Sequence, residues 1–106
     1  MNKEKLESCI NACEQCATDC DDCATECKKA GHEQVVKHCI ACADECRKCA
    51  EACKSGGDLA VKAAEKCAAA CDACADECEK HPDMACCKKC VESCRKCAAE
   101  CRSMAA

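Results

Sequence analysis

Cysteine recurs along this chain in steps that alternate between three and four residues. Alternating steps of this kind return to the same face of an α-helix, so the repeat predicts helices that each carry one stripe of cysteines. Short breaks divide the repeat into four segments, and only Cys86 falls outside it. The stripe residues are Cys9, Cys13, Cys16, Cys20, Cys23 and Cys27; Cys39, Cys42, Cys46, Cys49 and Cys53; Cys67, Cys71, Cys74 and Cys78; and Cys87, Cys90, Cys94, Cys97 and Cys101.

The breaks between the segments contain residues typical of helix ends. Gly31 follows two lysines, as at a helix C-terminus. The run Ser55-Gly56-Gly57 ends the second segment, and Asp58 is expected to cap the third helix. The run His81-Pro82-Asp83 ends the third segment, and Asp83 is the expected cap of the fourth helix.

These breaks predict four helices in a single domain that spans residues 1–106. The expected helices cover residues 3–29, 33–54, 58–80 and 84–104. Connections this short make neighbouring helices antiparallel. The predicted fold is therefore all-α: an up-down-up-down four-helix bundle with a cysteine-lined core.

Large apolar residues are too few to fill the core of such a bundle. Leu, Ile and Val together number eight, and Phe, Tyr and Trp are absent, whereas Cys and Ala each occur 21 times. Alanine is the best helix former, and a free thiol packs as a small hydrophobe. We therefore expect sulfur to occupy much of the interior.

Composition and charge exclude several classes of function. The net charge of −4, with both signs interspersed, gives no basic surface for nucleic acid. No apolar stretch approaches the roughly 20 residues of a membrane span. The first residues, MNKEKLESC, contain no hydrophobic signal region, so we expect a cytoplasmic protein.

The cysteines are expected to be reduced metal ligands. Their number is odd and their spacing regular, whereas disulfide scaffolds are spaced irregularly. Thiols in the cytosol stay reduced, and the thiolate is the form that binds metal. A catalytic cysteine is one thiol beside a positioned base, which differs from these equivalent stripes, so no enzyme activity is expected.

Seven C-x-x-C pairs occur within the stripes. Residues three apart on a helix face the same way, so two thiolates can approach one soft copper(I) ion. Zinc is the main alternative, because two such pairs from facing helices could supply its four ligands. The cysteines form one continuous ladder without an isolated set of four. This arrangement favours a store with a high capacity for copper(I) over a metallothionein-like buffer for zinc or cadmium.

An iron–sulfur protein is a less favoured alternative. The spacing C-x-x-x-C-x-x-C occurs five times, but it follows automatically from a stripe with alternating steps. The ferredoxin run with its trailing proline is absent.

Charge balance predicts the amount of copper. If each ion took two unshared thiolates, about 10 ions would leave a similar number of negative charges in the core, at a cost of several kcal/mol each. If every thiolate bridged two ions, about 20 ions would form a nearly neutral cluster. We therefore expect roughly one copper(I) per cysteine.

The two ends of the bundle are expected to differ. Three histidines and a methionine lie at the end that holds the first and third turns. Four of the residues there are candidate metal ligands at a mouth, namely His38, His81, Met84 and Cys86. The opposite end continues the stripes with apolar side chains and is expected to be a plug, made of Leu6, Ala60, Ala64 and Met104.

In these features the chain resembles the bacterial copper storage proteins, in particular their cytosolic branch. The resemblance covers nearly the whole chain. It depends most on the C-x-x-C ladders, the histidine-containing turns at 29–38 and 80–84, and the stretch CxxxCRSMAA at 97–106. It implies a four-helix bundle that binds many copper(I) ions through inward-facing cysteines, assembles as a homotetramer, and takes up metal at the histidine-containing end. The aromatic residues that such bundles usually contain are missing.

Overall fold

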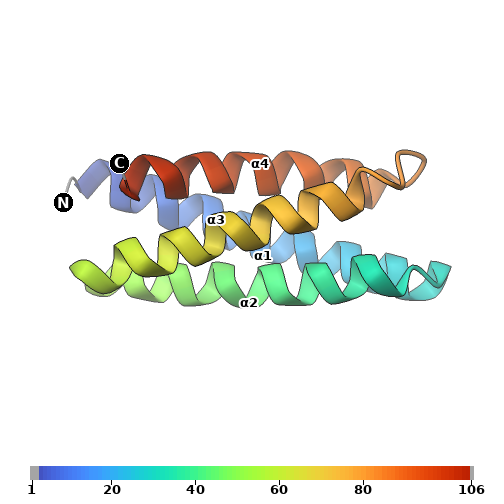
Figure 1. The fold of residues 1–106 in the computed structure, drawn as a ribbon, viewed down its shortest axis with the longest axis horizontal. Helices are drawn as coiled ribbons and strands as arrows, with labels where there is room; N and C mark the ends of the chain where they lie inside the picture. Colours follow the sequence, from blue (N-terminus) through green and yellow to red (C-terminus); the bar gives the residue numbers. More distant parts are fainter. Residues whose placement is uncertain (1–2, 106) are drawn as a thin grey trace.

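The structure is a computed structural model that describes residues 3–105, and these residues form four antiparallel helices (Figure 1). The helices are α1 (Lys3–Ala30), α2 (Glu33–Ser55), α3 (Asp58–Cys78) and α4 (Ala85–Ala105). Within the described residues each helix packs against two others: α1 and α3 each contact both α2 and α4. The predicted up-down-up-down four-helix bundle is therefore confirmed.

The bundle is elongated, with extents of 41 × 17 × 17 Å. The start of α1, the end of α4 and the α2–α3 turn lie at one end, which we call the closed end, and the other two turns lie at the opposite end, the histidine end (Figure 1). Among residues 3–105, no helix has the length and apolar character needed to cross a membrane.

The first turn has the hydrogen bonds expected of a glycine-terminated helix. Gly31 has a φ of 81°, the left-handed conformation that glycine adopts without a steric penalty. Its N–H bonds the carbonyl of Lys28, and the N–H of His32 bonds the carbonyl of Cys27. These two bonds form a Schellman motif, so the predicted end of α1 is confirmed to within one residue.

The predicted caps of α3 and α4 are wrong. Gly57 occupies the N-cap position of α3, and Asp58 is already the first helical residue. The helix α4 begins at Ala85, and the carbonyl of Met84 accepts hydrogen bonds from the N–H groups of its first turn. Asp83 therefore lies too early in the chain to cap α4.

The third helix also ends earlier than expected, at Cys78 instead of residue 80. Beyond the end of the helix, the N–H groups bond carbonyls three residues earlier in the chain instead of four. The N–H of Lys80 bonds the carbonyl of Glu77, and that of His81 bonds the carbonyl of Cys78. Such tightening is common where a helix ends, and it converts the last predicted residues into a turn.

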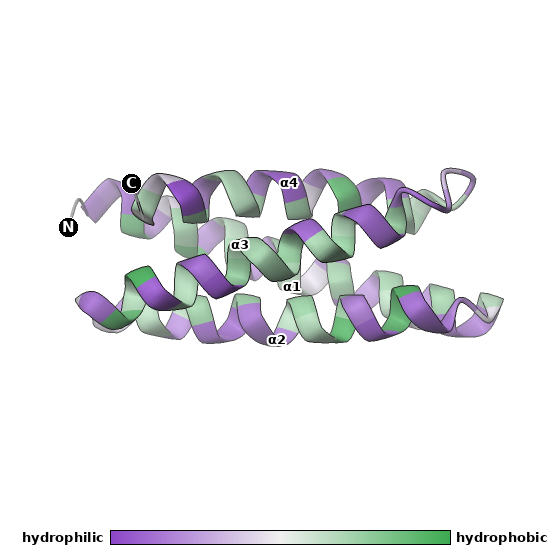
Figure 2. Ribbon diagram, in the orientation of Figure 1, coloured by the Kyte–Doolittle hydropathy of each residue, from purple (hydrophilic) through white to green (hydrophobic). Residues whose placement is uncertain are grey.

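All twenty stripe cysteines are buried, none with more than 2% of its surface exposed. Alanines, Val35 and Met104 complete the core. Hydrophobic and hydrophilic residues alternate along every helix, as expected where one face of each helix meets the core (Figure 2). The interior is thus built mainly from thiols, as the composition predicted.

Most charged residues lie on the outer faces, and some of them form ion pairs between adjacent helices. Arg47 of α2 pairs with Asp21 of α1, and Arg102 of α4 pairs with Asp72 of α3. Exposed pairs of this kind contribute about 0–1 kcal/mol each. They therefore add little to the stability that the core provides.

Asp19 is an exception, because its carboxylate is buried between α1 and α4 with 4% of the residue exposed. Gln15 donates a hydrogen bond to each carboxylate oxygen at 3.2 Å, and the hydroxyl of Ser93 donates another. The ammonium group of Lys89 lies 3.5 Å away. A buried carboxylate is stable only when it is paired in this way, so Asp19 joins the two helices.

We expect Asp19→Ala to lower the free energy of unfolding of the metal-free, reduced protein by about 1–3 kcal/mol, since it removes hydrogen bonds to a charged group. Urea unfolding followed by circular dichroism measures this loss. The matched control is Asp22→Ala, an exposed position on the same helix, which should stay within about 0.5 kcal/mol of the parent. Equal effects of the two substitutions would show that the Asp19 contacts do not stabilise the bundle.

Candidate metal centre

The sulfur atoms of the four stripes meet along the axis of the bundle. The middle layer takes one cysteine from each helix: Cys16, Cys42, Cys71 and Cys94. The Sγ atom of Cys16 lies 3.9, 4.0 and 3.7 Å from those of Cys42, Cys71 and Cys94 respectively. The Cys42 sulfur is 3.6 Å from that of Cys71 and 3.9 Å from that of Cys94. Four thiols from four helices therefore surround one point.

Similar layers continue toward both ends. On the side of the closed end, Sγ–Sγ distances of 3.7–4.0 Å join four thiols, namely Cys13, Cys46, Cys67 and Cys97. On the side of the histidine end, distances of 3.6–3.7 Å join another four, namely Cys20, Cys39, Cys74 and Cys90. The alternating sequence steps place the next cysteine of each stripe in the next layer.

The layers are connected to one another along the helices. Several pairs of cysteines four residues apart on one helix have sulfur atoms 3.8–4.0 Å apart, among them Cys16 and Cys20, Cys67 and Cys71, and Cys90 and Cys94. The result is one continuous sulfur lattice, as the predicted ladder requires. All its members are free, unbridged cysteines.

Groups of four sulfurs in this lattice share members. In five such groups the sulfur atoms all lie within 4.8 Å of one another, and Cys16 and Cys71 each belong to two of these groups. Zinc–sulfur bonds of about 2.3 Å place tetrahedral ligands about 3.8 Å apart, so any one group has the size of a zinc site. Adjacent groups cannot all hold zinc with unshared ligands, however, because they compete for the same thiols.

Burial keeps thiols at both ends of the lattice protonated. It raises the pKa of Cys27, near the histidine end, to about 12. It raises the pKa of Cys53, near the closed end, to about 11. A thiol with a raised pKa carries its proton at neutral pH, so a metal ion must displace that proton in order to bind.

In the middle of the lattice the thiols hydrogen-bond to one another, and these bonds shift their pKa values in opposite directions. The bond with Cys101 lowers the pKa of Cys97, and the bond with Cys16 lowers that of Cys42. The bond with Cys16 raises the pKa of Cys20. A thiolate is thus stabilised only while its neighbours remain protonated donors, so the lattice cannot ionise as a whole without cations.

At the histidine end, two contacts involve the predicted mouth residues. The rings of His32 and His81 stack with centroids 3.9 Å apart, which joins the two turns. The Nε2 atom of His38 instead lies 4.0 Å from a carboxylate oxygen of Glu77, across the α2–α3 interface. The sequence placed these residues at one end but did not indicate their pairing.

Met84 and Cys86 are both half-buried and pack against the core at this end. Cys86 is close enough to Cys27 and Cys87 to influence the pKa of each thiol electrostatically. The sulfur of Cys87 lies 3.6 Å from that of Cys27 and 3.8 Å from that of Cys23, and the last two are 3.8 Å apart. Cys86 therefore connects the surface to a triangle of buried sulfurs.

The closed end is packed as predicted, but it also contains a sulfur contact that the sequence analysis missed. Ala60 and Ala64 are completely buried, Leu6 is half-buried, and Met104 is 5% exposed. The Cys53 thiol donates to the thioether sulfur of Met104 at 3.6 Å. The step of three residues from Cys101 to Met104 was the available signal, because it continues the stripe.

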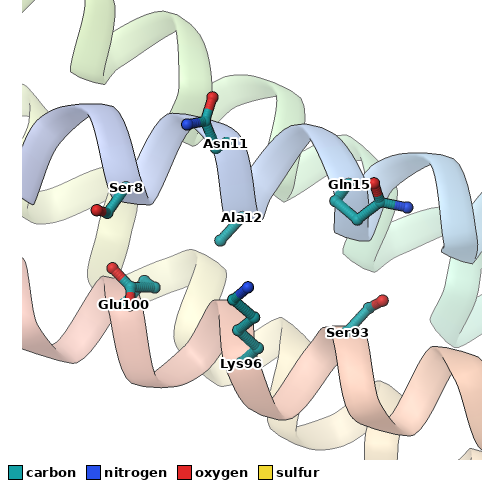
Figure 3. Close-up of a pocket in the computed structure, with 7 residues that line it drawn as sticks. All are labelled: Ser8, Asn11, Ala12, Gln15, Ser93, Lys96 and Glu100. Carbon is teal, nitrogen blue, oxygen red and sulfur yellow. The ribbon is translucent and has the colours of Figure 1, made fainter.

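A polar groove of about 460 Å³ lies between α1 and α4 on the outside of the bundle (Figure 3). It is separate from the sulfur lattice, because none of its lining residues is a cysteine, histidine or methionine. Those residues are Ser8, Asn11, Ala12, Gln15, Ser93, Lys96 and Glu100. The candidate metal ligands of this chain therefore lie in the buried core and not in this groove.

Comparison with known proteins agrees with this geometry. The chain matches the copper storage protein family, Csp, over residues 2–106. No curated protein is significantly similar to it. Among solved structures it is similar to the Cu(I)-bound copper storage protein BsCsp3, with 35% sequence identity and a TM-score of 0.90 over 96% of this chain and 99% of that one.

Two structures from Streptomyces lividans are also similar. One is a cytosolic copper storage protein with five coppers: 30% identity, a TM-score of 0.89, and coverage of 96% of this chain and 92% of that one. The other is Ccsp loaded with 10 copper equivalents: 31% identity, a TM-score of 0.90, and coverage of 98% and 86%. With the match over residues 2–106, these likenesses show that the chain belongs to the copper storage protein family.

Proposed function

We propose that this chain stores copper(I) in the cytosol as thiolate clusters inside the bundle, at about one ion per cysteine. The observation that carries the proposal is the continuous lattice of buried sulfurs. Family membership and the copper-loaded relatives support storage, and the cytosolic relative supports the location. The amount of copper and the arrangement of the clusters are inferred from the chemistry of the lattice.

Shared sulfurs favour copper(I) over zinc or cadmium as the cargo. Copper(I) is soft, prefers thiolate, and is stable with few ligands, so thiolates can bridge several ions. Structural zinc requires four ligands for each ion, and groups that share Cys16 and Cys71 cannot satisfy that demand independently. The lattice therefore has a much higher capacity for copper than for zinc.

Charge balance sets the proposed loading near one copper for each thiolate. An excess of buried thiolates would leave uncompensated negative charge, which costs several kcal/mol per group. When each Cu⁺ is matched by one thiolate, the cluster is nearly neutral. No catalytic role follows from this arrangement, because the thiols are equivalent and the histidines lie at one end only.

Copper is proposed to enter and leave at the histidine end. The proposed ligands, His38, His81, Met84 and Cys86, are half-buried donors there, and Cys86 adjoins the buried triangle that Cys87 completes. A soft ion could pass from one donor to the next without losing all its ligands. All four proposed entry ligands have their side chains at this end of the bundle.

A homotetramer is proposed from the resemblance to the family. Ile40 and Leu59 are 59% and 71% exposed, which is high for large apolar side chains. Contact with another copy of the chain would remove this apolar surface from water, at about 25 cal/mol per Å².

An anaerobic titration of the reduced protein against a chromophoric copper(I) chelator tests the storage proposal. We expect the protein to withhold roughly one copper per cysteine, because bridging thiolates balance the charge. A parallel zinc titration should saturate at no more than about one ion per four thiols. Saturation by a few coppers, with zinc bound at its full four-thiol ratio, would identify a zinc buffer and reject copper storage.

Copper binding should release about one proton for each cysteine that becomes a thiolate. The raised pKa values of Cys27 and Cys53 mean that these thiols are protonated at neutral pH, so acidification favours copper release and higher pH favours retention. A pH indicator in weakly buffered solution measures the protons during loading. Loading without proton release would show that the thiols were already ionised.

Replacement of both His38 and His81 by alanine should slow copper loading several-fold and leave the final amount nearly unchanged, because the lattice itself is intact. Stopped-flow absorbance during loading measures the rate, and chelator competition measures the capacity. Gln34→Ala, an exposed change at the start of α2, is the control and should load at the parental rate. A large loss of capacity in the histidine variant would contradict the mouth assignment.

A further inference from the structure

The closed end contains a soft donor outside the thiolate lattice, the thioether of Met104, which faces the last thiol of that lattice, Cys53. The Sγ atom of Cys53, the last stripe cysteine of α2, lies 3.6 Å from the Sδ atom of Met104, in the last turn of α4. Both residues are buried, with 2% and 5% of their surfaces exposed. Two sulfur atoms from different helices therefore face each other in a dry environment.

The surroundings of Cys53 differ from those of the other core thiols. At this end the stripes of α1 and α3 continue as Leu6, Ala60 and Ala64, which offer no donor atom. The thiols that act on Cys53 electrostatically include Cys9. Cys9 itself is 3.8 Å from both Cys49 and Cys101, in the next layer inward. A metal ion bound by Cys53 would thus find its nearest partner in the thioether of Met104.

We propose that Cys53 and Met104 form a copper(I) site at the closed end of the bundle. The inference rests on the proposed storage function and extends it, since Met104 adds a donor beyond the cysteines. On binding, Cu⁺ displaces the thiol proton of Cys53 to solvent and accepts a lone pair from the Met104 sulfur. The oxidation state of copper does not change, and no disulfide forms.

Charge explains why a thioether suits this position. One Cu⁺, one thiolate and one neutral thioether have no net charge, so the site needs no bridging ions to avoid buried charge. The inner layers reach neutrality by sharing thiolates on both sides, whereas Cys53 meets the thiols of Cys9 and Cys49 on its inner side and only the Met104 thioether toward the closed end. Met104 therefore completes the last site of the lattice without adding a negative charge.

The donor set also defines the metal. Thioether and thiolate together select copper(I), whereas zinc in proteins is bound by thiolate, imidazole and carboxylate. The apolar side chains around the pair keep water from supplying further ligands. The closed-end site should accordingly bind copper(I) and leave zinc unbound.

Selenium absorption spectroscopy tests the proposal directly. The protein produced with selenomethionine carries selenium at Met1, Met84 and Met104, and its Met104→Leu variant carries selenium at Met1 and Met84 only. After loading with copper(I) under anaerobic conditions, we expect a selenium–copper scattering contribution at the selenium edge of the parental protein. The contribution should be smaller in the labelled Met104→Leu variant, because the selenium atom that faces Cys53 is gone while Met1 and Met84 are unchanged. Leucine and methionine have similar volumes, so the closed end should stay packed.

The copper content of the same samples separates this proposal from the storage function. High copper content with no selenium–copper contribution in the parental protein would overturn the Met104 site and leave storage intact. An equal contribution in the parental protein and in Met104→Leu would assign the signal to Met1 or Met84 and also overturn it. A few coppers per chain in both proteins would instead reject the storage function on which the proposal rests.

Discussion

The whole structure depends on the burial of thiols in place of large hydrocarbon side chains. A thiol is small and only weakly polar, so twenty of them can occupy the interior without the hydrogen-bonding cost of other polar groups. Such a core buries less apolar surface per residue than one made of leucine. Ions that bind only to the folded chain then stabilise it by mass action, so cargo and stability are linked.

The regular spacing of the cysteines also allows this packed core to bind metal ions. Because each stripe steps by three and four residues, each layer brings together thiols from different helices, and each layer adjoins the next. The pKa shifts within the lattice show the consequence: a thiolate such as that of Cys97 is stabilised by a protonated neighbour, so the thiols cannot all ionise together. Soft cations supply the missing positive charge. Storage capacity therefore follows from the same geometry that closes the core.

The two ends of the lattice differ in the donor atoms that they contain and in how tightly they are packed. At the histidine end, the turns expose donors of several types, and Cys86 reaches toward the buried triangle of Cys23, Cys27 and Cys87. At the closed end, alanines seal the bundle, and within residues 3–105 a neutral thioether lies next to Cys53 as an additional donor. An accessible end suits the proposed exchange of ions with solvent, whereas a sealed end suits their retention.

The sequence by itself determined the fold class, the approximate helix bounds and the inward direction of the cysteines, because the period of a stripe specifies which face of a helix it occupies. It also placed the histidines at one end of the bundle, because turns this short make neighbouring helices antiparallel. Tertiary structure alone decided which side chains meet across helices: Asp19 with Ser93, His38 with Glu77, His32 with His81, and Cys53 with Met104. The caps at Asp58 and Asp83 were misplaced for a related reason, since helix ends depend on local hydrogen bonds that shift by a residue or two. Periodicity gives the direction of a side chain from its own helix, but the distance to a partner depends on how the neighbouring helix is rotated and displaced along the axis.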